Sequence, residues 1–542
     1  MTGLERFFEQ YYRLRPVNAT FTGVHAHDER LPDWSPEGLA SALDEMRTLR
    51  RELLATSDSS RDRALAISFL DVQIAEHESG HFQRSNPSLA LGEATFGVIS
   101  LMTRPFDEIG IRGRATVLRL RAIPAFLDNA RRSIEAVPDA WRAKTLRECE
   151  GAERLLRDGI DRWVAIESVP PRIARHLVTG ARGALAAVGR FREWLQREAP
   201  AAGAGRCVAG SELFDLLLAR GHWDRRSRAD LARDAAEALD EALARLDERA
   251  RQLTPGGWPE VQQRLAAAHP TTAGYLRRYQ EIWEACRASA DAHRLVTWPD
   301  YPIRYVPIPW QTRDAAPFLY YLHYRSPAPF DRLPIHDYVV TPIDAAMDGE
   351  EQQRRLRATN DSVIKLNHVV HHGAIGHHVQ NHFAYAGSSE IGRVAAVDCA
   401  SRIGMFLGGT MAEGWACYAT DLMDECGFFT PGESLAQQQT RARLLARAVV
   451  DIGLHEGSLS LDAAAAIYRD RIGMADEAAR AEVCKNSMFP GTAVMYWLGT
   501  DGIHRLRRRV ERAEGSSFSL RAFHDRLLGF GAVPVALIAD AW

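Results

Sequence analysis

Histidine is concentrated in one short segment of this chain of 542 residues. Downstream of that segment, MAEGWACYAT contains Glu413. Two imidazoles and a more distant carboxylate form the ligand set of catalytic zinc in many hydrolases. We therefore predict a site for zinc or another divalent transition metal, in preference to a helix whose histidines only make structural hydrogen bonds. The segment LNHVVHHGAIGHHVQNH holds His368, His371, His372, His377, His378 and His382.

Two histidine pairs in this segment have a spacing that suits a regular helix. Residues four apart lie on the same face of a helix, and the common HExxH motif uses that spacing to bind zinc. HExxH itself is absent from the segment. Either pair could nevertheless chelate a metal: His368 with His372, or His378 with His382.

A third pair, His371 and His377, needs a distorted helix. The two residues are six apart, so on an unbroken helix they point about 120° away from each other. They converge only if the helix is irregular between them. Gly373 and Gly376 give a reason for such an irregularity.

Five blocks in the same order along the chain resemble domain-of-unknown-function family 885, a distant relative of the gluzincin zinc metallopeptidases. The pattern of that family is HExxPGHxxQ, EGWAxY, DxGxH, PGQAxxY and FHxxLLxxGxxP. The similarity extends over essentially the whole chain. The matching blocks here are HHGAIGHHVQ at 371–380, EGWACY at 413–418, DIGLH at 451–455, PGTAVMY at 490–496 and FHDRLLGFGAVP at 523–534.

The resemblance implies roles for several residues in these blocks. It implies that His371, His377 and Glu413 are the metal ligands, which selects the pair spaced by six. It also implies that His455 and Tyr496 face the metal, where they could donate hydrogen bonds to an oxyanion that develops on the substrate. The alternatives are a buried helix histidine and a packed aromatic residue.

Three further residues are candidates for binding substrate. Arg507 falls near an arginine of the family, and its planar guanidinium could hold a substrate carboxylate. A solvated basic face explains the RLRRR run equally well. Tyr320 and Tyr321 lie in a segment with strand character, and gluzincin-type enzymes often align substrate along an edge strand. Core packing is the alternative for these two tyrosines.

The chain departs from the family pattern at His372, where the family has glutamate. In metallopeptidases that glutamate takes a proton from the metal-bound water and passes it to the leaving amine. His372 could act as the base, since imidazole has a pKa of about 6.5. It could instead be an additional metal ligand. Hydrolysis could also have been lost.

The function that we expect is a divalent-metal-dependent hydrolase, with zinc the expected metal. The expected substrate is a small amide, a peptide-like compound or a carboxylate-bearing compound, although ordinary peptidase activity is doubtful without the glutamate. One alternative is a metal-dependent lyase or isomerase. Another is a non-catalytic descendant of a metallopeptidase that binds a metal or a ligand.

The pattern of the remaining sequence is mostly helical. Long Leu/Ala/Arg segments with a period of 3.6 residues predict helices over 60–200, 225–254 and 270–294. Residues 297–345 are rich in Tyr, Pro, Val and Ile, and predict a small β-sheet just before the metal-site helix. We therefore expect a mainly α, gluzincin-like body. It divides into a helical region, 1–296, that walls the cleft, and a metal-site region, 297–542, within one continuous body.

Composition narrows the classes of partner. The 67 Lys+Arg residues nearly balance the 70 Asp+Glu residues, which argues against a nucleic-acid-binding protein. No apolar run is long enough to span a membrane, and no signal peptide is evident. The seven scattered cysteines favour a reducing, cytoplasmic location. The expected partner is a small-molecule or peptide-like substrate, and the oligomeric state is not predicted.

Overall fold

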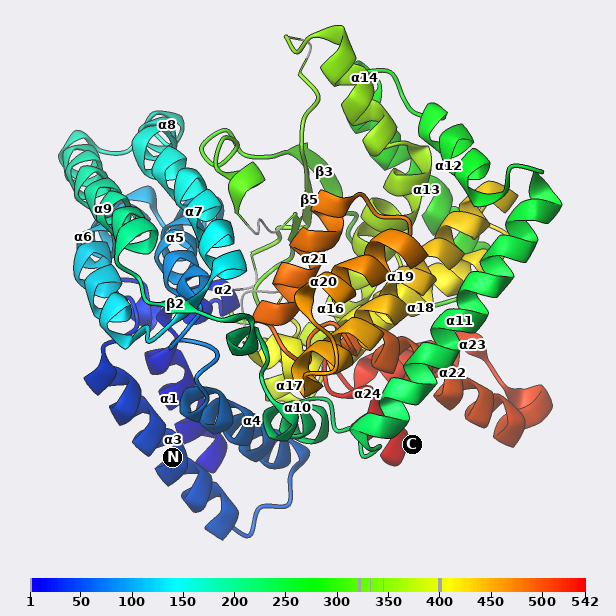
Figure 1. The fold of residues 1–542 in the computed structure, drawn as a ribbon, viewed down its shortest axis with the longest axis horizontal. Coiled ribbons are helices and arrows are strands. Elements are labelled where there is room, and N and C mark those ends of the chain that lie inside the picture. The colour runs from blue at the N-terminus through cyan, green and yellow to red at the C-terminus, as the bar shows by residue number, and fades with distance from the viewer. Residues whose placement is uncertain (1, 320–322, 332, 345, 398–401) are drawn as a thin grey trace.

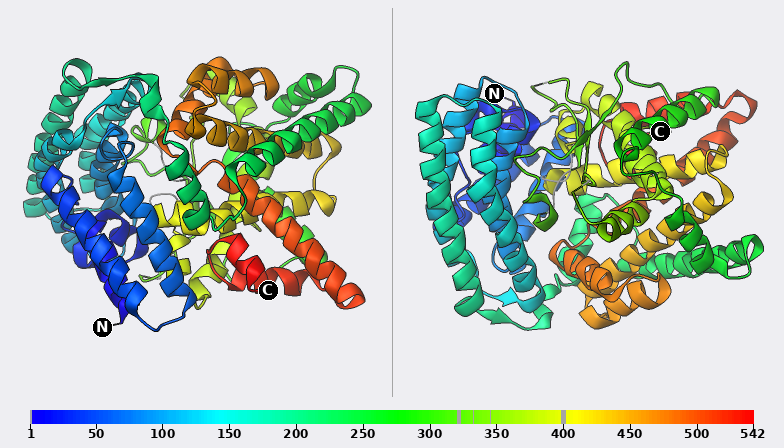
Figure 2. Two further views of the ribbon diagram at one scale, coloured as in Figure 1. Left: turned by 60° about the horizontal axis from the view of Figure 1, so that its bottom comes forward. Right: turned by 90° about the horizontal axis from the view of Figure 1, so that it is seen from above.

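The computed structural model describes residues 2–319, 323–331, 333–344, 346–397 and 402–542. The chain is mainly helical, with 72% helix and 2% strand, which confirms the predicted fold class. The helices of the first 200 residues gather on one side of the molecule and most later helices on the other (Figure 1). The two views of Figure 2 show the same division. None of the described helices has the length and apolar character needed to cross a bilayer.

The amino-terminal helices are amphipathic and pack against one another. The buried side chains of α9 recur every three to four residues, and this stripe packs against α6. Ser35 caps α3 by accepting a hydrogen bond from Gly38 N–H, with Pro36 at the first helical position. The helices are α1 (Gly3–Leu14), α2 (Pro16–Thr22), η1 (His25–His27), α3 (Pro36–Ala55), α4 (Arg61–Glu78), α5 (Pro87–Thr103), α6 (Ile109–Ser133), α7 (Asp139–Arg154), η2 (Leu155–Gly159), α8 (Ile160–Ile166) and α9 (Pro171–Arg197).

The following helices lead across to the other side of the molecule. In this group α11 packs along α19 and α13 packs against η6, so both lie beside the metal-site helices although they precede residue 297. The helices are η3 (Ala204–Cys207), α10 (Ser211–Leu216), η4 (Leu217–Gly221), α11 (Arg228–Leu253), α12 (Gly257–Ala267) and α13 (Tyr275–Ala292).

The strands form two small sheets. The first pairs β1 (Val137–Pro138) with β2 (Ala201–Ala202) in parallel, within a stretch that the sequence did not indicate as strand. The second has the order β3-β5-β4, with β3 and β5 parallel and β4 and β5 antiparallel. This sheet lies where the sequence predicted it. Its strands are β3 (Arg304–Pro307), β4 (Tyr324–Arg325) and β5 (Asp337–Val340), with η5 (Ala316–Phe318) between β3 and β4.

The remaining chain is helical to its end. These helices are α14 (Gly349–Ala358), α15 (Asp361–Val363), η6 (Ile364–Gly373), α16 (His377–Ala386), α17 (Glu390–Ala395), η7 (Gly404–Gly408), α18 (Gly409–Glu425), α19 (Pro431–Glu456), α20 (Leu461–Ala466), η8 (Ile467–Arg471), α21 (Asp476–Met488), α22 (Met495–Glu514), η9 (Gly515–Ser517), α23 (Leu520–Gly529) and α24 (Val535–Asp540).

One hydrophobic core joins the two sides of the molecule. Phe69 of α4 belongs to the same buried cluster as Trp283 of α13 and Trp415 of α18. A second cluster, which includes Leu120 and Trp163, lies mainly within α5–α9. The shared core means that the amino-terminal helices are packed onto the histidine-bearing half as part of one body.

Candidate metal centre and its cavity

The histidine segment leaves the regular helix between Gly373 and Gly376. The π-helix η6 ends at Gly373, and α16 begins at His377. A side-chain Cβ at Gly376 would lie 1.8 Å from the carbonyl oxygen of His371, so only glycine fits this turn. The irregularity that the sequence predicted is therefore present, and it brings His371 and His377 together.

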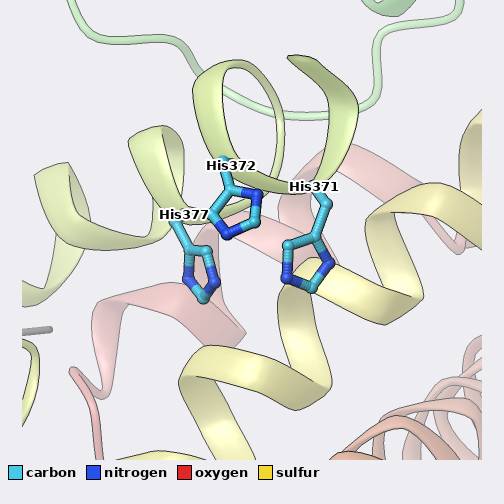
Figure 3. Close-up of side chains that lie close together, drawn as sticks. All are labelled: His371, His372 and His377. Atoms are coloured by element: carbon cyan, nitrogen blue, oxygen red, sulfur yellow. The ribbon is translucent and has the colours of Figure 1, made fainter. Parts of the chain in front are cut away.

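Three imidazoles face one another at this turn (Figure 3). The ring centroids of His371 and His377 are 4.9 Å apart, and His372 lies within 5.3 Å of both. One nitrogen from each of the three rings lies within 4.8 Å of the other two. A single metal ion can be reached by side chains arranged in this way after small shifts.

Glu413 of α18 completes the cluster. Its Oε2 lies 3.4 Å from Nε2 of His371 and 3.6 Å from Nε2 of His377. Atoms that bind one tetrahedral zinc ion at about 2.0–2.2 Å are separated by about 3.4 Å, so these spacings suit shared coordination. Oε2 is buried and has no hydrogen-bond partner among the described residues. A buried carboxylate oxygen without a partner needs an explanation, and a cation supplies one.

In each pair with regular helical spacing, at least one histidine is engaged elsewhere. His368 makes a hydrogen bond of 2.6 Å between its Nδ1 and the hydroxyl of Tyr338. His378 donates from Nε2 to the carbonyl oxygen of Tyr301, and His382 Nδ1 lies 3.3 Å from the hydroxyl of Tyr301. The pair spaced by six is thus the one that the structure turns toward Glu413.

Electrostatics keep the cluster in the form that binds cations. Burial lowers the pKa of His371, and burial with the neighbouring imidazoles lowers the pKa of His372 well below its usual value. Burial opposes ionisation of Glu413, but His371 and His377 outweigh it and hold the pKa of this carboxyl well below its usual range. His371 and His372 are therefore neutral and Glu413 is a carboxylate at neutral pH, which are the forms that bind a divalent transition metal.

His372 has a defined tautomer. Its Nδ1–H donates to the carbonyl oxygen of Asn367 at 2.7 Å, which leaves the lone pair on Nε2. His372 can therefore accept a proton or bind a metal at Nε2, and cannot donate from that atom while neutral.

Two tryptophans hold the irregular turn from its backbone. Trp283 Nε1–H donates to the carbonyl oxygen of Gly373, and Trp415 Nε1–H donates to that of Ile375, both at 2.8 Å. These carbonyls have lost their helical partners at the distortion, so the indoles replace the missing hydrogen bonds. The sequence prediction missed both residues. The signal for Trp415 was its place two residues after Glu413 in EGWACY.

A close contact between α18 and α22 holds the helix that carries Tyr496 against the helix that carries Glu413. A Cβ at Gly499 would lie 1.9 Å from the carbonyl oxygen of Thr410, and one at Gly414 would lie 2.6 Å from the backbone of Gly499. The two helices therefore touch through their backbones. Tyr496 and Glu413 both line the same cavity of 470 Å³.

This cavity runs between the two sides of the molecule. One wall comes from α1 to α5 and α7, and the other from α18, α19, α21 and α22. The guanidinium of Arg447 on α19 lies over the ring of Tyr496, 5.2 Å from its centroid. A volume of this size suits a small-molecule ligand.

His455 does not line this cavity, contrary to the role that the resemblance implied. It is fully buried, its Nδ1 accepts from Ala209 N–H, and its Nε2 donates to the carbonyl oxygen of Asn486. Burial lowers the pKa of His455 to about 4, which keeps the ring neutral. Both ring nitrogens are thus used to join backbone segments.

The rest of the DIGLH block positions the loop before α22. Asp451 accepts hydrogen bonds from Gly491 N–H at 3.1 Å and from Val494 N–H at 3.0 Å. The DIGLH block therefore holds the start of the PGTAVMY segment, whose last residue, Tyr496, lies in the first turn of α22.

Arg507 is also directed away from the cavity. It donates to carboxylate oxygens of Glu425 and Glu511 at 2.8 and 2.7 Å and to the hydroxyl of Tyr418. A guanidinium with two carboxylate partners has little remaining charge to offer a substrate. Tyr320 and Tyr321 lie outside the described residues.

Comparison with known proteins places the chain in a family. The family model described as "Bacterial protein of unknown function (DUF885)" matches residues 16–541. The chain belongs to this family. No curated protein is significantly similar to it.

Two solved structures share the fold of this DUF885 chain. A predicted lipoprotein of unknown function from Shewanella oneidensis has a TM-score of 0.77 at 20% identity, over 99% of this chain and 98% of that one. A predicted lipoprotein from Colwellia psychrerythraea has a TM-score of 0.76 at 16% identity, over 99% and 97% of the two chains. The architecture is therefore common to all three proteins over their full matched length.

Proposed function

We propose that this protein is a divalent-metal-dependent hydrolase, with zinc the expected metal, that acts on a small amide or peptide-like compound. The observation that carries the proposal is the buried Oε2 of Glu413, which has no hydrogen-bond partner among the described residues and toward which Nε2 of His371 and of His377 both point. In this proposal these three residues hold the metal. The metal, when bound, would polarise a substrate carbonyl and activate water. The same ligand types occur in the gluzincin peptidases that the sequence resembles.

His372 is the proposed acceptor of the proton from the attacking water. Its Nδ1 is held by the carbonyl of Asn367, and so its free lone pair is on Nε2, beside the two ligand histidines. Tyr496 lines the cavity next to this cluster and is the proposed donor to negative charge on the substrate. His455 is not included, because both of its ring nitrogens bind backbone groups.

The same geometry favours a second candidate. The nitrogens of all three histidines gather within 4.8 Å, as three ligands of one ion would. His372 would then be a ligand, and a proton acceptor would be missing. A lyase or isomerase, which needs no base at that position, fits this arrangement better than a peptidase.

Elemental analysis of purified protein tests the proposal and separates the two candidates. We expect one metal ion per chain in the natural protein, and loss of that metal in His371→Ala, His377→Ala and Glu413→Gln. Retention of metal by His372→Ala supports the proton-transfer role, whereas its loss supports the ligand role. A natural protein that takes up no zinc, manganese, iron or copper would sink both candidates.

Activity of a fifth variant tests the reaction. His372→Glu restores the glutamate of the family pattern at the same position. If the protein is a hydrolase, this variant should cleave N-acyl amino acid or dipeptide amide bonds at least as fast as the natural chain. An inactive His372→Glu that still binds one metal, together with an inactive natural chain on the same panel of amides, would favour the non-catalytic alternative.

A further inference from the structure

Most cationic side chains that line the cavity are already paired. Each of four such cations makes an ion pair with a carboxylate, which removes most of its attraction for a ligand. The pairs are Arg13 with Glu45, Lys144 with Glu148, Arg402 with Glu76, and Arg447 with Glu482.

Arg15 differs from these four. Its Nη2 donates to Oε1 of Gln73, a neutral acceptor, and no carboxylate of the described chain lies within ion-pair distance of its guanidinium. Its flat face lies 5.4 Å from the ring centroid of Tyr11 and 5.7 Å from that of Phe69. A guanidinium has five N–H donors, so several remain for a ligand in the cavity.

The position of Arg15 is fixed by the backbone and by a side-chain relay. The residue lies at the junction of α1 and α2, where its N–H donates to the carbonyl oxygens of Tyr11 and Tyr12. Gln73 Nε2 donates to Glu76 Oε2 at 2.6 Å, and this bond turns the amide oxygen toward Arg15. A side chain held in this way loses little entropy when it binds a ligand.

The acidic neighbours of Arg15 offset the positive charge of its guanidinium only in part. Glu76 is engaged by Arg402 and Gln73. Glu93 lines the same cavity but makes no ion pair or hydrogen bond with any described residue, and burial raises the pKa of Glu93 to about 7. At neutral pH this carboxyl is protonated for about half of the time, so it only partly offsets the guanidinium. A desolvated cation of this kind favours an anionic ligand.

We propose that Arg15 binds the free carboxylate of the substrate through its planar guanidinium. The substrate class that follows is a short peptide or N-acyl amino acid with an unblocked carboxylate. The cavity of 470 Å³ that Arg15 shares with Glu413 limits the ligand to this size range. The identity of the reaction rests on the proposed function, but the binding of the carboxylate does not require a metal. Arg15 takes the role that the sequence had suggested for Arg507.

Calorimetric titration tests this proposal on the full chain, both metal-loaded and after treatment with a chelator. The probes are a panel of N-acetyl dipeptides, each as the free acid and as its carboxyl-terminal amide. We expect at least one free acid to bind ten-fold or more tightly than its amide. Arg15→Gln should remove that preference, and Arg15→Lys should keep part of it.

Arg13→Gln is the matched control. It removes the same charge two residues before Arg15, but from an arginine that already has a carboxylate partner. It should leave the acid preference within two-fold of the natural value. The proposal is overturned if no free acid binds better than its amide, or if the preference survives Arg15→Gln. Normal metal content without acid preference refutes only this inference. Acid preference that depends on Arg15 in a protein unable to take up metal refutes only the proposed function.

Discussion

The turn at His371–His377 and the carboxyl-terminal end of α19 both carry histidines inside matched family blocks, and they use the ring nitrogens differently. At the turn, Nε2 of His371 and Nε2 of His377 point to a carboxylate oxygen that has no other partner in the described part of the chain. At the end of α19, both nitrogens of His455 bind backbone groups and the ring is fully buried. Block matching finds both regions, but only the partners of the polar atoms distinguish a site from a support.

The largest expected effect is on metal affinity. Loss of a residue that hydrogen-bonds a metal ligand weakens metal binding by roughly 10–100-fold. Glu413→Gln and His377→Ala change the proposed ligands themselves, so each should weaken zinc binding by more than this. His455→Ala should leave zinc affinity unchanged within about three-fold. Competition with a chromophoric chelator measures all three. Equal losses in His455→Ala and His377→Ala would remove the distinction between the two regions.

The reverse order is expected for stability. His455→Ala leaves Ala209 N–H and the carbonyl of Asn486 buried without their partner, and should destabilise the fold by about 2–5 kcal/mol. Glu413→Gln keeps a side-chain oxygen beside His371 and His377 but loses the charge that they stabilise, so it should destabilise the metal-free protein by less than His455→Ala does. Denaturant unfolding of metal-free proteins gives both values. A metal-free Glu413→Gln that unfolds as readily as His455→Ala contradicts the comparison.

The stability of the protein at different pH values gives a further test, because Glu93 lines the cavity and has no hydrogen bond or ion pair with any described residue. Its pKa is about 7 in the folded chain against 4.5 as its usual value. Between these values the folded chain keeps a proton that the unfolded chain has released, so stability falls as pH rises from about 4.5 to 7. Glu93→Gln should therefore become more stable relative to the natural protein over this window, by at most about 3 kcal/mol. Thermal unfolding at pH 5 and pH 8 measures the difference, and a pH-independent difference is the contrary outcome.

The smallest expected effect concerns the support of the turn. Trp415→Phe keeps the buried ring but leaves the carbonyl of Ile375 without its donor. We expect zinc affinity to fall by about ten-fold, because the turn that carries His377 is no longer fixed. Trp497→Phe on α22, away from the turn, is a control of the same type. Unchanged affinity in Trp415→Phe would show that the glycines alone hold the geometry.

Much of the fold follows from local patterns in the sequence. Amphipathic periodicity predicted the long helices, and the composition of 297–345 predicted a small sheet in that segment. The pairing of β1 with β2 was not predictable, since two-residue strands leave no periodicity and these two lie far apart in the chain. The packing of α11 and α13 beside the later helices also depends on contacts distant in sequence. The six described cysteines are free, and the cytoplasmic location stays a prediction.

The candidate site was predictable where its chemistry is local. The glycines at 373 and 376 indicated that His371 and His377 could converge. Arg507 was selected by its place after a block, but Glu425 and Glu511 are its partners. Glu511 is four residues further along α22 and could have been recognised from its spacing, whereas Glu425 lies on α18 and could not. Arg15 was missed because what sets it apart is the lack of a carboxylate partner, which only the packed structure reveals.

The backbone contact between α18 and α22 has a consequence for how this protein can diverge. Since Gly414 and Gly499 set the separation of the two helices, the relative position of Glu413 and Tyr496 on this wall of the cavity does not depend on the side chains that line it. Substitutions along the walls can then change which molecules fit while the ligand histidines and the carboxylate keep their spacing. New preferences can arise from single lining residues, whereas the two glycines are closed to such change.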